Sequence, residues 1–164
     1  MAWFLGLDSS TQSLSAAIID ATEGVMVAEY SVSFGGDLPE YSCPQGFLSH
    51  PDPLVKHSDP LMWVAALDLL LTKMTEDGVD FARIAGISGS GQQHGTVYLN
   101  ARSLSSAPWE AGNSLVDRVS PMLSRKTSPI WMDSATSAEC AEITAAAGGV
   151  DAVRRRTGSS AVER

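Results

Sequence analysis

The chain has 164 residues, which is long enough for one domain with a hydrophobic core. Its formal net charge of −8 at pH 7 argues against a nucleic-acid-binding surface, which needs clustered basic side chains. No apolar run is long enough to span a membrane. We interpret the one basic cluster, Arg154-Arg155-Arg156, as a solvated helix end. Cys43 and Cys140 lie far apart, in no metal-ligand spacing, and predict free thiols.

The N-terminal half begins with three predicted strands, at residues 3–7, 14–20 and 25–33. Short turns join them, which predicts an antiparallel meander. In the third strand, one face is expected to carry Met26, Ala28, Tyr30 and Val32. The first strand starts without a basic leader, so we expect no signal peptide and a cytoplasmic protein. Residues 35–59 are rich in Gly, Pro, Ser and Asp and predict a long loop.

Helices then alternate with strands. Asp59 is a predicted cap for a helix that starts at Pro60 and ends at Asp77-Gly78. Its apolar residues at helical spacing are Leu61, Val64, Leu67, Leu71 and Met74. Strands are predicted at 84–88, 96–99 and 130–132, with an irregular stretch over 101–129. A capping box at Thr136–Glu139 predicts a last helix that ends at Gly148-Gly149. This order indicates an α/β domain with a mixed sheet.

The stretch "GLDSSTQS", residues 6–13, is the first candidate site. A carboxylate at a strand end, followed by small hydroxyl residues in a tight turn, suits a phosphate and metal site with Asp8 near Mg²⁺. An ordinary polar hairpin is the alternative, because these residue types are common in turns. There is no P-loop motif, and Ser88 lacks the final glycine of a nucleophile elbow. Asp8 has Ser10 two positions on, rather than a second aspartate, which weakens an aspartyl-phosphate hypothesis.

Two further stretches carry candidate residues. In "ISGSGQQHGTVYLN", residues 87–100, glycines open the backbone around Gln92, Gln93 and His94. These side chains offer neutral hydrogen-bonding groups, which suit a polyhydroxylated small molecule. In "PIWMDSATSAEC", residues 129–140, Asp133 follows an apolar strand and precedes a helix. The alternative is that Asp133 has only a structural role, as the N-terminal cap of that helix. Trp131 would by default lie in the core.

Together and in this order, the three stretches resemble the FGGY carbohydrate kinases of the actin-like sugar kinase superfamily. "FLGLDSSTQS" is similar to the first phosphate motif, "GISGSGQQHGTVYL" to the sugar-side loop and "PIWMDSATSAEC" to the W-x-D segment. Within the family the resemblance is closest to the longer, eukaryote-like xylulose kinases, with "DLPEY", "LMWVAALD" and "TGS-x-A-x-E-R" as further counterparts. It covers nearly the whole chain.

The resemblance implies a ribonuclease H-like, actin-like ATPase fold with flanking helices, of which residues 1–164 form the N-terminal part of the first domain. It implies ATP and Mg²⁺ as cofactors and transfer of phosphate to a ketopentose, with D-xylulose favoured. Asp8 would help position Mg²⁺ and the phosphates, and the turn around them would be formed by Ser9, Ser10, Thr11 and Gln12. Gln93 and His94 would contact sugar hydroxyls, Asp133 would shape the sugar pocket and Trp131 would pack behind it.

Two departures from the family pattern leave alternatives open. Relatives often have an arginine that reaches the sugar after "TGS", where this chain has Ser160, so ribulose, gluconate or glycerol remain possible substrates. The family's general-base aspartate and its adenosine-binding second domain lie beyond residue 164. We therefore expect a truncated chain that is inactive alone, with an exposed edge or apolar patch that favours self-association. A non-catalytic sugar- or nucleotide-sensing module is the alternative outside the enzymes.

Overall fold

A computed structural model of the chain describes residues 2–104 and 113–163. One mixed sheet carries the architecture, with strand order β3-β2-β1-β5. Its strands are β1 (Trp3–Ser9), β2 (Ser13–Asp20), β3 (Val25–Ser33) and β5 (Ile84–Gly91). The first three form the predicted antiparallel meander, and β5 pairs parallel with β1. The prediction of an α/β domain with a mixed sheet is confirmed.

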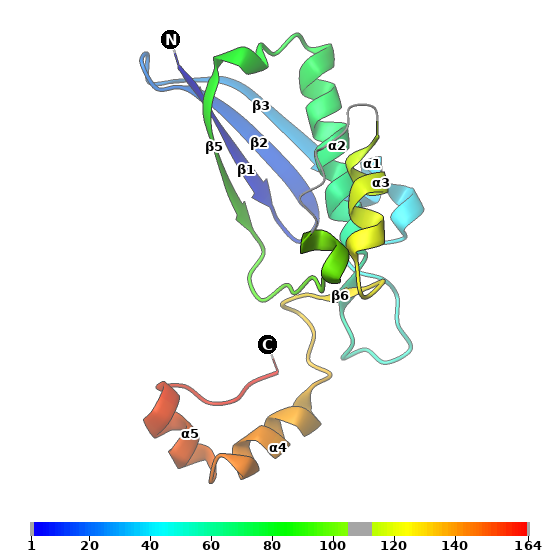
Figure 1. Ribbon diagram of the computed structural model, residues 1–164, viewed down its shortest axis with the longest axis vertical. Helices are drawn as coiled ribbons and strands as arrows, with labels where there is room; N and C mark the ends of the chain where they lie inside the picture. Colours follow the sequence, from blue (N-terminus) through cyan, green and yellow to red (C-terminus); the bar gives the residue numbers. More distant parts are fainter. Residues whose placement is uncertain (1, 105–112, 164) are drawn as a thin grey trace.

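Helix α2 (Pro60–Glu76) covers one face of this sheet (Figure 1). The Asp59 carboxylate accepts a hydrogen bond from the backbone N–H of Leu61 at 2.8 Å, and Pro60 is the first helical residue, as predicted. The helix buries a stripe at four-residue spacing, formed by Met62, Ala66, Leu70 and Met74. The stripe packs on buried side chains of the first three strands, chiefly Leu5, Leu14, Ala16, Ile18 and Val32.

The opposite face of the sheet is not covered by the described residues, and Phe4, Ile19 and Met26 are 45%, 46% and 61% exposed on it. The expectation that Met26 shares a face with Val32 is wrong. A register shift between Ile18 and Ile19 leaves Val27 as an extra residue in β3, so Met26 pairs with Ile19 on the uncovered face.

The remaining elements are short. They are α1 (Phe34–Asp37), β4 (His57–Ser58), α3 (Leu115–Val119), β6 (Ser128–Pro129), α4 (Ser137–Ala146), α5 (Val150–Thr157) and 3₁₀ turns at Pro39–Tyr41, Phe81–Arg83, Ala101–Leu104 and Ser120–Met122. Strands β4 and β6 pair antiparallel. Helices α4 and α5 lie apart from the sheet, next to the C-terminal end (Figure 1). No helix in the described ranges has the length and apolar character needed to cross a bilayer.

Several boundaries differ from the predictions. Residues 35–59 are not purely loop, because α1, a 3₁₀ turn and β4 lie there. The predicted strand at 96–99 is absent from the described residues, with only an isolated bridge between Leu99 and Leu123. The apolar run at 130–132 follows β6 rather than forming it. Of the irregular stretch over 101–129, residues 105–112 lie outside the described part of the chain.

Candidate functional site

The carboxyl ends of β1 and β5 lie side by side, because these strands are parallel neighbours in the sheet. Asp8 is paired with Ser90, and Ser9 with Gly91. The backbone N–H of Gln92 then donates to the Ser9 carbonyl at 2.9 Å and prolongs the pairing beyond the strand end. This register brings the β1–β2 turn, residues 8–13, next to the glycine-rich loop at 91–95.

The Asp8 carboxylate is exposed and receives two hydroxyl hydrogen bonds. Ser10 donates to Oδ2 at 2.6 Å, and Ser90 donates to Oδ1. The hydrogen bond from Ser10, followed by that from Ser90, lowers the pKa of Asp8 below its ordinary value. Asp8 is therefore ionised at neutral pH.

An open hollow of about 390 Å³ lies at this edge of the sheet. It is lined by Asp8, Ser10, Thr11, Gly91, Gln92, Gln93, His94 and Trp131. The structure thus brings together five of the predicted site residues, which are Asp8, Ser10, Thr11, Gln93 and His94. His94 has a φ of 57°, the left-handed conformation that non-glycine residues seldom adopt. The loop backbone is therefore set in an unusual conformation at the residue predicted to meet the sugar.

Two other predicted residues of the β1–β2 turn do not line this hollow. Ser9 lines a separate apolar groove between the sheet and the helices α2 and α3. Gln12 is exposed, and its carbonyl accepts a hydrogen bond from the backbone N–H of Phe34 at 2.9 Å. Ser9 and Gln12 thus shape the turn through the backbone, whereas Ser10 and Thr11 present hydroxyls to the hollow.

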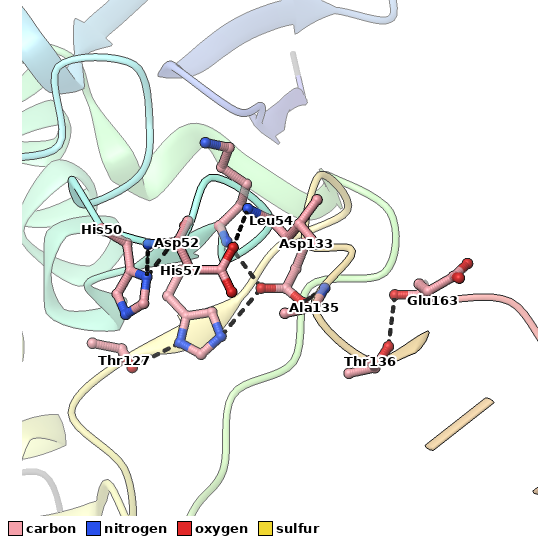
Figure 2. Close-up of polar contacts among 10 residues, drawn as sticks. His50, Asp52, Leu54, His57, Thr127, Asp133, Ala135, Thr136 and Glu163 are labelled. Carbon is pink, nitrogen blue, oxygen red and sulfur yellow. Dashed lines mark hydrogen bonds and ion pairs between the residues drawn. The ribbon is translucent and has the colours of Figure 1, made fainter. Parts of the chain in front are cut away.

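Asp133 lies outside this hollow and is 5% exposed. Figure 2 shows the polar contacts of its side chain with His57 and Ala135. Its Oδ2 accepts the backbone N–H of Lys56 at 2.9 Å and lies 3.3 Å from His57 Nε2. Its Oδ1 accepts the backbone N–H of Ala135 at 3.2 Å, and the Thr127 hydroxyl is 3.0 Å from His57 Nδ1. Asp133 therefore joins the loop before β4 to the segment after β6.

The alternative that Asp133 caps a helix is wrong, since the residue before α4 is Thr136. The predicted capping box does not form either, because the Thr136 side chain makes no cap hydrogen bond and donates to the Glu163 carbonyl at 3.3 Å instead (Figure 2).

Sequence reasoning missed the contact of Ser90 with Asp8 and the hydrogen bond from Trp131 to Thr11. Ser90 was not a candidate, although the alternation of β5 opposite β1 places it beside Asp8. Trp131 was expected in the core by default, and behind the sugar pocket from the family resemblance. It is 39% exposed and lines the hollow, and its indole Nε1 donates to Thr11 Oγ1 at 2.9 Å. Gln92 also lines the hollow, and its Oε1 is buried without a hydrogen-bond partner among the described residues.

The described residues hold no group of three His, Cys, Asp or Glu side chains that could bind a metal ion by themselves. A single carboxylate at the hollow still fits Mg²⁺, which is commonly held by one or two carboxylates together with substrate phosphates and water. Asp8 supplies one ionised carboxylate at the hollow. The hollow therefore fits a Mg²⁺ ion that arrives bound to substrate phosphates and water.

The chain is similar to xylulose kinases over almost its whole length. It is 43% identical to xylulose kinase from Rattus norvegicus and 42% identical to xylulose kinase 2 from Arabidopsis thaliana, each over 98% of this chain. The chain spans about 30% of the length of these curated relatives. No family model matches the chain.

Solved structures show the same fold. The xylulose kinase from Rhodospirillum rubrum superimposes with a TM-score of 0.69 over 98% of this chain and 26% of that chain, at 23% identity. The predicted ribonuclease H-like, actin-like fold of the sugar kinases is confirmed by this likeness.

Proposed function

Because the chain is homologous over 98% of its length to xylulose kinases, we propose that its parent protein transfers the γ-phosphoryl group of ATP to a ketopentose, with D-xylulose favoured. Residues 1–164 form the N-terminal part of the first kinase domain in this proposal. The observation that carries it is the hollow where Asp8 and the β1–β2 turn meet Gln93 and His94. In this proposal the β1–β2 turn would bind phosphate and the loop at 91–95 would bind sugar hydroxyls, and both line the same hollow.

The roles follow from the chemistry of each group. Phosphoryl transfer is mostly positioning and neutralisation of charge. Asp8, whose pKa Ser10 and Ser90 lower below its ordinary value, would hold Mg²⁺ on the phosphates, and the metal would supply positive charge against the phosphoryl oxygens. The Gln93 amide and His94 imidazole would bind and orient the sugar hydroxyls. Asp133 would act on the pocket indirectly, by holding the backbone around the segment that carries Trp131.

A general base must accept the proton of the attacking hydroxyl. We place this base in an aspartate beyond residue 164, together with the domain that binds adenosine. Both cysteines are free thiols, which supports a reducing, cytoplasmic location that cell fractionation would test.

The experiment is sugar-dependent ADP release over a panel of ketopentoses, polyols and aldonates, for this chain and for the full-length gene product. We expect turnover with D-xylulose in the full-length protein alone, and a loss of about 100-fold or more for Asp8→Asn. Turnover by residues 1–164 alone would contradict the placement of the base. Preference for ribulose, gluconate or glycerol would correct the substrate, and no turnover in either protein would favour the sensing module.

A further inference from the structure

The hydroxyl groups in and beside the hollow differ in their hydrogen-bond partners. The Ser10 and Ser90 hydroxyls both donate to the Asp8 carboxylate. Thr11 Oγ1 instead accepts a hydrogen bond from Trp131 Nε1, over 2.9 Å. Within residues 2–104 and 113–163, no acceptor is found for the proton of the Thr11 hydroxyl itself. Of the two hydroxyl side chains that line the hollow, Ser10 and Thr11, Thr11 is therefore the one with a hydroxyl proton left for a ligand.

The indole N–H restricts where that proton can point. A hydroxyl has one donor and two acceptor lone pairs, and its hydrogen rotates to suit its partners. With the Trp131 N–H at one lone pair, the hydroxyl hydrogen must point away from the indole. Thr11 and Trp131 both line the hollow, so an acceptor there can receive it. The neighbouring Asp8 carboxylate, which would hold Mg²⁺, makes phosphate the anion that fits best.

We propose that Trp131 is a positioning residue for phosphate, because its indole N–H orients the Thr11 hydroxyl to donate to a phosphate oxygen in the hollow. The proposal rests on the proposed function for the identity of that phosphate as part of ATP. It also gives the segment after β6 a direct connection to the β1–β2 turn, 120 residues away in the chain.

The first test observes the indole group directly and needs no activity. In ¹⁵N-labelled chain, the indole signal that is lost in Trp131→Phe reports this hydrogen bond. We expect Thr11→Val to shift that signal and to raise its hydrogen exchange by about five-fold, as for loss of a typical hydrogen bond. Thr11→Ser keeps the hydroxyl and should leave the signal in place. Magnesium pyrophosphate should move it in the wild type and not in Thr11→Val.

The same residues can be separated kinetically in the full-length protein. We expect Trp131→Phe to raise the KM for ATP about five-fold with a smaller change in the KM for sugar, since a hydrogen bond to a charged group loses its orientation. Trp63→Phe is the matched control. The Trp63 indole Nε1 is buried without a partner among the described residues and lies at the apolar groove, so its removal should leave both KM values unchanged.

A double variant tests whether the two residues act as one unit. Trp131→Phe combined with Thr11→Val should be no worse than Thr11→Val alone. Additive losses, or equal KM values for Trp131→Phe and Trp63→Phe, would overturn the proposal, as would a Trp131 signal that ignores Thr11→Val. A wild type without sugar-dependent ADP release would refute the proposed function instead, and the indole signal would still decide the role of Trp131.

Discussion

Gly46 is the residue where one added carbon should disturb the candidate site most. It is buried, has a φ of 85° and donates its backbone N–H to the Cys43 carbonyl at 2.9 Å. A Cβ at this position would lie 1.8 Å from the carbonyl oxygen of Thr11 and 2.8 Å from its carbonyl carbon. Since no real Cβ approaches backbone so closely, Gly46→Ala must displace either its own loop or the β1–β2 turn.

The expected cost has two parts. Alanine in a left-handed conformation costs about 1–2 kcal/mol, and forcing an extra carbon into a packed site costs typically about 1–3 kcal/mol. We therefore expect Gly46→Ala to lower the free energy of unfolding by about 2–5 kcal/mol. Gly24→Ala is the control, because Gly24 has a φ of 67° and nothing lies within 4 Å of its Cβ position. It should lose only the backbone part.

Urea unfolding followed by far-ultraviolet circular dichroism measures both variants against the wild type. The difference between them isolates the contact with Thr11. If Gly46→Ala and Gly24→Ala lower the free energy of unfolding equally, within about 0.5 kcal/mol, that result would contradict the close approach of Gly46 to the β1–β2 turn. A shift of the Trp131 indole signal in Gly46→Ala, and not in Gly24→Ala, would show that the β1–β2 turn with Thr11 is the part that is displaced.

Three further variants test other contacts. Asp133→Ala should lower the free energy of unfolding by about 2–3 kcal/mol in urea unfolding, since it leaves two backbone N–H groups without an acceptor; Asp133→Asn should lose less, and equal losses would contradict this reasoning. The hydrogen bond from the backbone N–H of Ser33 holds the pKa of Asp37 below its ordinary value, so this carboxylate stabilises the fold above the unfolded pKa and the gain is lost as pH falls through the folded pKa. Stability measured from about pH 5 to pH 3 should therefore fall less in Asp37→Asn than in the wild type. Light scattering should show self-association of this chain that Met26→Lys reduces, because that side chain is 61% exposed on the uncovered sheet face; a monodisperse wild-type monomer would count against this expectation.

Local chemistry made much of the fold predictable. The meander, the start of α2 at Asp59-Pro60 and its end at Asp77-Gly78 depend on short turns and caps whose residues are adjacent in the chain. The apolar stripe of α2 was less predictable. The helix has apolar residues on several sides, so its periodicity alone did not identify the buried face. It predicted Leu61, Val64 and Leu67, whereas the side chains buried against the sheet are Met62, Ala66 and Leu70.

The candidate site was predictable only where a motif lies within one turn. Asp8, Ser10, Thr11, Gln93 and His94 stand in two short loops, and strand order brought those loops together. The contacts from Ser90 and Trp131 depend on register and on a distant segment, for which sequence spacing holds no signal. The bulge in β3 likewise follows from pairing with β2 and moved Met26 to the other face.

The parallel pairing of β1 with β5 also has a kinetic consequence. Each hairpin of the meander closes over a short turn, but Asp8 and Ser90 are 82 residues apart in the chain. Closing such a loop costs chain entropy before any contact compensates for it, which slows folding. During synthesis the meander emerges first. The part of the hollow formed by the loop after β5 is absent until β5 leaves the ribosome. The candidate site at this edge of the sheet is thus completed only after the meander has formed, and a ligand of that site could act on the folding reaction only after this step.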